Sequence, residues 1–293
     1  MIFTTPVELP AGTMEISHRS RLLLIGSCFA DNIGRMLQRN KFNIDTNPFG
    51  VQYNPMSIAT VLTRIADGDL FTPGSPELFE HNGKWHSLLH HSDFSRDSKE
   101  ELLATINDRL AKAHKAVSEL DTIIVTFGTA YVYTRTNDGL VVGNCHKLPG
   151  NMFSRSLLTI EQIIESTAAV MRHYIAANPK VKFMFTVSPI RHFKDGAHGN
   201  QISKASLLVG TEDFLNYAQQ SLSNLHTDYF PAYEIVMDEL RDYRFYAEDM
   251  CHPSSQAVDY IRERFLSWAL PASEHPVLEE NIRNFKRISH KKQ

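Results

Sequence analysis

The sequence predicts an α/β fold in which helices cover both faces of a central, mostly parallel sheet. Short apolar runs without polar alternation occur at 21–25, 122–127 and 182–187, as in strands that are buried on both faces. Segments with helical periodicity lie between these runs, and such alternation is typical of right-handed strand–helix–strand crossovers. We therefore expect a three-layer sandwich of helices, sheet and helices.

Helical periodicity can be followed along most of the chain. The segments that show it are 28–39, 56–66, 98–117, 159–177, 203–222 and 254–269. A further strand is expected near 233–238, and a hairpin at 131–143, where Asn137, Asp138 and Gly139 form a turn between two apolar runs. Residues 68–97 are rich in Pro, Gly and His, interrupt the alternation, and predict an irregular insertion.

Length and composition indicate a single domain. Of the 293 residues 42% are hydrophobic, so one large core can form. The net charge is −3 with both signs interspersed, which does not favour nucleic acid as a partner. We expect one domain over 1–293, with a core at about 20–270, the insertion at about 68–97, and a basic, frayed and solvated tail at about 280–293.

The cysteine content and the N-terminal residues bear on the compartment. Cys28, Cys145 and Cys251 are too few and too far apart for a disulfide framework, which favours a reducing environment. The N-terminal residues lack a basic region followed by an apolar core, and no 18 consecutive apolar residues occur. We expect a cytoplasmic protein without membrane association. The sequence carries no indication of an oligomeric state.

A first candidate site follows the apolar run at 21–25. There Gly26, Ser27 and Cys28 lead directly into a helix, so two nucleophilic side chains are expected at its N-terminus. Exposed N–H groups and the positive end of the helix dipole favour a thiolate or an oxyanion at such a position. A purely structural interpretation is also open, with Ser27 as the N-cap and Cys28 as a small buried side chain.

A second candidate site lies near the C-terminal end, where two residues separate Asp249 from His252. A loop is expected there, because Pro253 follows and Ser254 or Ser255 is a suitable N-cap for the next helix. Such a loop can hold one ring nitrogen on the carboxylate, so that the other nitrogen points at a nucleophile. Taken alone, a pair with this spacing is more often a surface Asp that caps a turn beside a solvated histidine.

Together these motifs resemble the SGNH (GDSL-like) hydrolase superfamily, in which a nucleophile follows the first strand and an Asp-x-x-His precedes the last helix. The chain is more similar still to the GSCFA family, named for the run found here at 26–30. The resemblance extends from about residue 20 to 268 and implies a flavodoxin-like fold. Its other segments are NPFG at 47–50, TFGTA at 126–130, NCHK at 144–147, VSPIRH at 187–192 and YRFY at 243–246.

The resemblance also implies roles for the two motifs. Matching Gly26 to the glycine of the superfamily's Gly-Asp-Ser pattern places Cys28 at the attacking position and Ser27 in a supporting one. A thiol at a helix N-terminus beside an imidazole ionises near neutral pH, whereas a serine hydroxyl needs full general-base assistance. His252, oriented by Asp249, is then the base. Ser27 remains the alternative nucleophile if the turn is one residue tighter.

Oxyanion stabilisation is expected from the backbone N–H groups of Cys28 and Gly128, with Gly50 as a third candidate donor. The superfamily's Gly-x-Asn-Asp block is absent, because the chain reads Gly-Thr-Ala-Tyr from residue 128. Thr129 or Asn144 could replace the missing Asn side chain. The alternative for Gly128 is a turn glycine without a catalytic role.

Further polar side chains are expected around the site. We interpret His146, Lys147, Arg191 and His192 as a wall that binds or orients substrate, although a structural salt bridge is an equal alternative for Arg191. All four belong to segments that carry the family resemblance. They also follow expected strands or the expected hairpin, where ligands bind in a doubly wound sheet.

The insertion contains a cluster formed by His86, His90 and His91. Two imidazoles one helical turn apart could bind a metal ion, but the segment is irregular and lacks Cys pairs. Contacts of His90 and His91 with substrate, or simple solvation, are therefore favoured. We expect neither a metal nor another cofactor.

The resemblance implies a hydrolase, or an acyltransferase, that acts on an ester or thioester through an acyl-enzyme intermediate. A small-molecule or glycan acyl ester is the expected partner, and a carbohydrate O-acyl ester is the class that the superfamily suggests, although no residue specifies it. A non-catalytic ligand-binding module on the same fold is the alternative. The missing Gly-x-Asn-Asp block favours this alternative, and the intact Asp-x-x-His opposes it.

Overall fold

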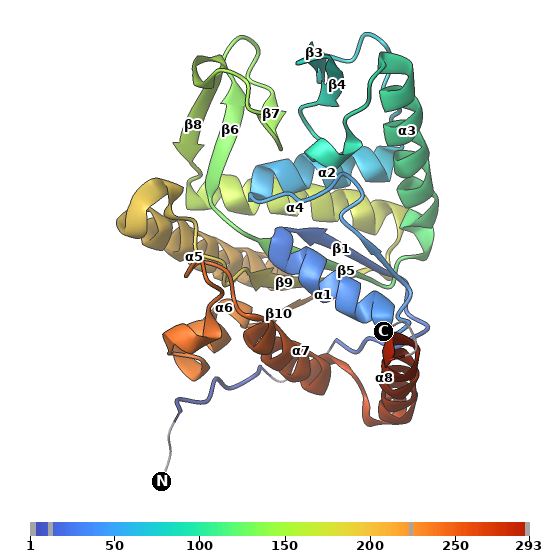
Figure 1. Ribbon diagram of the computed structural model, residues 1–293, viewed down its shortest axis with the longest axis vertical. Coiled ribbons are helices and arrows are strands. Elements are labelled where there is room, and N and C mark those ends of the chain that lie inside the picture. The colour runs from blue at the N-terminus through green and yellow to red at the C-terminus, as the bar shows by residue number, and fades with distance from the viewer. Residues whose placement is uncertain (1–3, 11–13, 223–224, 291–293) are drawn as a thin grey trace.

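A five-stranded parallel sheet lies between two layers of helices in the computed structural model, which describes residues 4–10, 14–222 and 225–290 (Figure 1). The order β10-β9-β5-β1-β2 puts the second strand of the chain outside the first, as in flavodoxin-like sheets. The strands are β1 (Leu22–Gly26), β2 (Ile44–Thr46), β5 (Thr122–Phe127), β9 (Lys182–Val187) and β10 (His226–Tyr229).

Both faces of the sheet are covered, which explains why its central strands are apolar throughout. Side chains alternate between the faces: Leu23 and Ile25 join one core cluster, and Leu22 and Leu24 join the other. The helices on the first face are α2 (Pro55–Asp67), α3 (Lys99–Ala116), α4 (Ile160–Ala177) and α5 (Gly196–Ser221), and those on the second are α1 (Cys28–Arg39) and α7 (Ser255–Ala269).

The predicted three-layer architecture is confirmed, and so are the three apolar strands β1, β5 and β9. The helices expected at 28–39, 56–66, 98–117, 159–177 and 254–269 are present within one residue at each end. The helix expected at 203–222 begins earlier, at Gly196.

The prediction of a strand near 233–238 is wrong. This segment forms α6 (Ala232–Glu234) and a turn of π-helix (Ile235–Glu239), and the fifth strand of the sheet is β10, which precedes it. Ile235 and Val236 are buried in the second core cluster. A short apolar run looks the same in a buried helical turn as in a buried strand, and this explains the error.

Two small antiparallel sheets lie beside the central one (Figure 1). The first confirms the hairpin predicted at 131–143 and adds a third strand that was not foreseen; it consists of β6 (Tyr131–Arg135), β7 (Val141–Val142) and β8 (Phe153–Leu157). The second lies within the expected insertion and consists of β3 (Leu78–His81) and β4 (Lys84–Ser87).

The segment that was expected to be a frayed tail is helical as far as it is described. It forms α8 (His275–His290), and the amide of Asn281 donates a hydrogen bond to the carbonyl oxygen of Asn40 (3.0 Å) at the end of α1. Lys291 and Lys292, which were part of the expected basic tail, lie outside the described residues.

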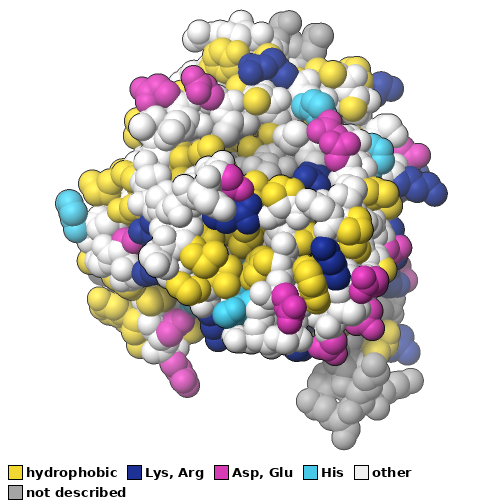
Figure 2. All heavy atoms as spheres, turned by 90° about the horizontal axis from the view of Figure 1, so that it is seen from above, with side chains coloured by type: hydrophobic (Ala, Val, Ile, Leu, Met, Phe, Trp, Pro, Cys, Tyr) yellow, Lys and Arg dark blue, Asp and Glu magenta, His cyan; other side chains and the backbone are white. Residues whose placement is uncertain are grey.

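The surface agrees with the mixed charge of the sequence. In the view from above, acidic and basic side chains are interspersed among hydrophobic ones (Figure 2). Within the described ranges, no helix combines the length and hydropathy needed to cross a membrane.

Candidate active site

The turn after β1 positions both candidate nucleophiles. Gly26 has a φ of 152°, and a Cβ atom on it would lie 2.3 Å from the carbonyl oxygen of Thr126, so only glycine fits. Its N–H donates to Oδ1 of Asn47 (2.8 Å), which joins the end of β1 to the loop after β2. The chain can therefore pass directly from the strand into α1, with residues 27 and 28 at the start of that helix.

Ser27 and Cys28 have different environments. Ser27 is fully buried, and its Oγ accepts a hydrogen bond from the N–H of Phe29 (3.3 Å), so it is the N-cap of α1. Cys28 is half-buried and lines a cleft of about 720 Å³. Its Sγ lies 3.3 Å from Oη of Tyr53. Of the two side chains, only that of Cys28 faces the cleft.

Asp249 and His252 form a close pair in the loop before α7. Nδ1 of His252 lies 2.5 Å from Oδ2 of Asp249, whose Oδ1 accepts hydrogen bonds from the N–H groups of Cys251 and His252 (2.9 Å each). The N–H groups of His252 and Cys251, followed by the imidazole, lower the pKa of Asp249 to about 2. The carboxylate is thus charged at neutral pH and holds the ring. His252 lines the same cleft as Cys28.

The backbone N–H groups of the expected oxyanion residues, Gly50, Gly128 and Thr129, already donate to carbonyl oxygens in this structure. Tyr53 accepts at its carbonyl oxygen from the N–H groups of Gly128 (2.8 Å) and Thr129 (3.0 Å), and Gly50 donates to the carbonyl of Asn47 (2.8 Å). The acceptors, Asn47 and Tyr53, both belong to the loop after β2, which runs beside the end of β5.

Gly50 has a conformational role instead. Its φ is 79°, and a Cβ atom there would lie 2.2 Å from Cβ of His91. The N–H of His91 donates to the carbonyl oxygen of Phe49 (2.8 Å). The glycine therefore allows the insertion to pack against the loop after β2.

Thr129 and Asn144 both line the cleft, but their side chains are bonded to neighbours. The hydroxyl of Thr129 lies 2.9 Å from Oγ of Ser203, and the amide of Asn144 donates to Oγ of Ser92 (3.3 Å). Oδ1 of Asn144 accepts from the N–H of His146 (2.9 Å). In this structure each side chain holds a loop at the wall of the cleft.

The expected polar wall is present in part. Lys147, Arg191 and His192 line the cleft, whereas His146 does not. His146 is buried beside the insertion with Nε2 2.8 Å from the carbonyl oxygen of Ser87, and burial lowers its pKa to about 4. The structure thus does not bring His146 to the cleft.

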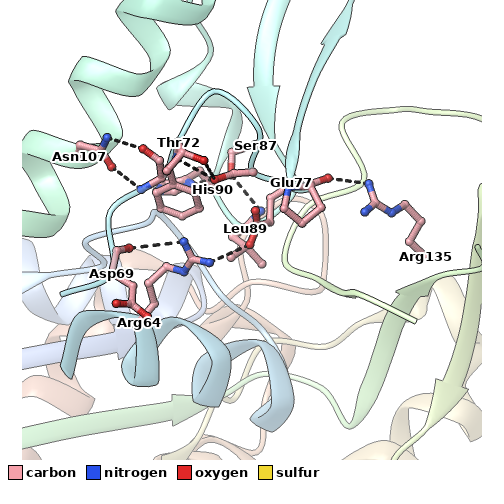
Figure 3. Close-up of polar contacts among 12 residues, drawn as sticks. Arg64, Asp69, Thr72, Glu77, Ser87, Leu89, His90, Asn107 and Arg135 are labelled. Carbon is pink, nitrogen blue, oxygen red and sulfur yellow. Dashed lines mark hydrogen bonds and ion pairs between the residues drawn. The ribbon is translucent and has the colours of Figure 1, made fainter. Parts of the chain in front are cut away.

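Of the two histidines expected to contact substrate from the insertion, His91 lines the cleft and His90 does not. His90 is fully buried and stacked on Phe49, with ring centroids 4.1 Å apart, and its Nδ1 lies 2.8 Å from Oγ of Ser87 (Figure 3). Burial lowers the pKa of His90 well below its usual value. Within the described part of the chain, no group of three or more His, Cys, Asp or Glu residues is placed to hold a metal ion.

Two residues near the cleft were missed in the sequence. Tyr53 contacts Cys28 through its hydroxyl, and burial raises its pKa. Lys204 is fully buried in α5, and its Nζ donates to the carbonyl oxygens of Gly128 and Ser188 (2.6 Å each), at the ends of β5 and β9. Burial lowers the pKa of Lys204 to about 7. Neither residue belongs to a short motif, and only tertiary contacts reveal them.

The fold and the cleft define a class of protein. It is a flavodoxin-like α/β protein in which Cys28, after the first strand, and His252, from the Asp–His pair before α7, line one cleft at the carboxyl end of a parallel sheet. The family model for GSCFA matches residues 21–265, and the chain belongs to this family.

Solved structures that the chain resembles include two esterases. An acetyl xylan esterase (Est2A) from the rumen bacterium Butyrivibrio proteoclasticus is 11% identical, with a TM-score of 0.44, and the match covers 85% of this chain and 63% of that one. A family two carbohydrate esterase from Clostridium thermocellum, in complex with cellohexaose, is 12% identical, with a TM-score of 0.39 and coverages of 90% and 65%. The chain thus spans slightly less than two thirds of each of these structures. No curated protein matches the sequence.

Proposed function

We propose that this protein is a hydrolase that cleaves acyl esters or thioesters, with Cys28 as nucleophile, His252 as general base and Asp249 as the carboxylate that orients the base. One observation carries the proposal: His252 is held at Nδ1 by Asp249, and its ring shares one cleft with the thiol of Cys28. A held imidazole leaves Nε2 for proton transfer, which is the arrangement that activated nucleophiles require.

The reaction would proceed in two steps. In the first, Nε2 of His252 accepts the thiol proton of Cys28, the thiolate attacks the acyl carbon, and the alcohol or thiol leaves with the proton from His252. In the second, His252 removes a proton from water, the resulting hydroxide attacks the acyl group on sulfur, and the carboxylic acid leaves as the thiolate of Cys28 takes this proton back from His252.

Two groups near the sulfur suit the developing oxyanion. The N–H of Cys28 is at the first position of α1, where helix N–H groups lack an intrahelical acceptor. The hydroxyl of Tyr53 lies 3.3 Å from Sγ of Cys28. These donors take over the role that the sequence suggested for Gly128 and Gly50, whose N–H groups are engaged. Ser27 is the less suitable nucleophile because its hydroxyl is buried and caps α1.

A second candidate function is a non-catalytic binding module on the same fold. The engaged N–H groups of Gly50 and Gly128 favour it, because they leave fewer oxyanion donors than the resemblance suggests. An acyltransferase differs from the hydrolase only in the acceptor of the second step. A glycan O-acyl ester is one substrate that we propose to test.

The test compares turnover of 4-nitrophenyl acetate and of acetylated xylan by the wild type and by four variants. Cys28→Ala and His252→Ala are expected to lose almost all activity, while Ser27→Ala keeps activity in proportion to its folded fraction. The control is His173→Ala, because His173 also forms a histidine–carboxylate pair, with Asp67 (2.6 Å), on the surface away from the cleft. Turnover by Cys28→Ala or by His252→Ala equal to that of the wild type would contradict the proposal.

A further inference from the structure

Besides Arg155, three basic side chains line the cleft. Lys147 follows β7, and Arg191 and Lys194 follow β9. Asp195 is the only acidic residue that lines the cleft in the described part of the chain, and it is bound to Arg155 (2.7 Å). The wall therefore carries an excess of positive charge, although the whole chain has a net charge of −3.

None of these three cations forms a salt bridge with a described acidic residue. Lys194 instead donates to Oη of Tyr133 (2.5 Å), and the guanidinium of Arg191 lies over the ring of Phe193 at 5.2 Å. The fourth cation of the cleft, Arg155, is neutralised by Asp195. Uncompensated charge in a concave site raises the local concentration of oppositely charged ligands.

Arg191 links this charge to the proposed reaction centre. Its N–H donates to the carbonyl oxygen of Cys251 (3.1 Å), the residue before His252. Its side chain is half-buried, unlike those of Lys147 and Lys194, which are exposed. The backbone of Arg191 is thereby tied to the loop that carries the base, and a group bound by its side chain would lie in the same cleft as Cys28.

We propose that the cleft binds acyl esters or thioesters that carry an anionic group, either a phosphate monoester or a carboxylate. The acyl chemistry in this statement rests on the proposed function, whereas the binding of the anion does not. A guanidinium recognises either anion through two parallel N–H donors, and the lysines act as point charges. Tyr133, which bonds to Lys194, limits the positions that this ammonium group can take.

The test measures dissociation constants by calorimetry with the full chain carrying Cys28→Ala, so that binding is separated from turnover. The first set of probes is glucose, glucose 6-phosphate and glucuronate; the second is pantetheine and 4′-phosphopantetheine. In at least one set, the anionic member is expected to bind about tenfold or more tightly than the neutral one at low ionic strength. Comparison of the two sets shows whether the anion belongs to a sugar or to a pantetheine group. Comparison of glucose 6-phosphate with glucuronate separates a phosphate from a carboxylate.

Additional substitutions in the same background assign the preference to the cleft. Arg191→Gln and Lys194→Gln are each expected to reduce it to less than about threefold. Lys115→Gln, at an exposed position at the end of α3, is the matched control and should leave it unchanged. The proposal is overturned if no anionic probe is preferred, or if the preference survives both cleft substitutions. Because all binding is measured in the Cys28→Ala background, the result does not depend on whether the hydrolase proposal is correct.

Discussion

His252 and His90 show how differently two imidazoles can be used in one protein. His252 is about half exposed, lines the cleft, and is held at Nδ1 by the charged carboxylate of Asp249. His90 is fully buried against Phe49, and only a hydroxyl, that of Ser87, contacts its Nδ1. Burial disfavours a charged ring, so His90 stays neutral. In the proposed reaction, the carboxylate of Asp249 would hold the ring of His252 while it carries the proton.

Each ring nitrogen Nδ1 is held by a residue three positions earlier in the sequence, so the chemistry of that partner and the solvent exposure of the ring make the difference. Both residues lie in segments that looked suited to a site, and only one faces the cleft. Substitutions in the two places should therefore affect different properties: activity at His252, and stability at His90.

The largest effect is expected for His252→Ala. Loss of a general base typically lowers the rate about 10²–10⁴-fold, and the exposed position of His252 predicts an unchanged melting temperature. Steady-state kinetics with an activated ester and a thermal melt measure both properties. A large loss of stability in this variant would show that His252 resembles His90 and would undo the comparison.

His90→Ala should have the opposite profile. Removing a fully buried ring leaves a cavity between Phe49 and Phe71 and is expected to cost about 2–5 kcal/mol of the free energy of unfolding. The activity of the remaining folded protein should be close to that of the wild type. Urea unfolding gives the free energy, and a loss of turnover in the fully folded variant would place His90 in the site.

Asp249→Ala is expected to lower activity, but less than His252→Ala does, because the imidazole remains but is no longer held. The two substitutions should not be additive, so the double variant should be little worse than His252→Ala. Additive losses in kcat/KM would mean that the two residues act independently.

The pH dependence of stability sharpens the comparison further. Burial lowers the pKa of His146 to about 4, and the unfolded chain takes up this proton near pH 6.5. The unfolded state therefore binds more protons between these values, and the free energy of unfolding falls as the pH falls from about 6.5 to about 4. His146→Asn, which suits the local φ of 48°, should make this decline shallower in urea titrations at several pH values. An identical decline in the variant would contradict the burial effect.

Local features of the sequence were sufficient for much of the fold and for part of the site. Buried strands leave apolar runs, and the Gly26 turn and the Asp249–His252 loop are each contained in a few consecutive residues, so they were recognised. The burial of His90 and the hydrogen bond from the N–H of Gly128 to the carbonyl oxygen of Tyr53 depend on contacts between distant segments. Periodicity and short motifs contain no information about such contacts. The gathering of cations in the cleft also depends on contacts between distant segments, so it could not be predicted from the sequence.

The central claim is that Cys28 attacks the acyl group with the help of His252. Rapid mixing with 4-nitrophenyl acetate, acid quenching and peptide mass spectrometry would identify the acylated residue. The account predicts one acetyl group on the peptide that contains Cys28, bound through sulfur and removable by hydroxylamine, with formation slowed in His252→Ala and absent in Cys28→Ala. An acetyl group on Ser27, or turnover without any acetylated peptide, would contradict it.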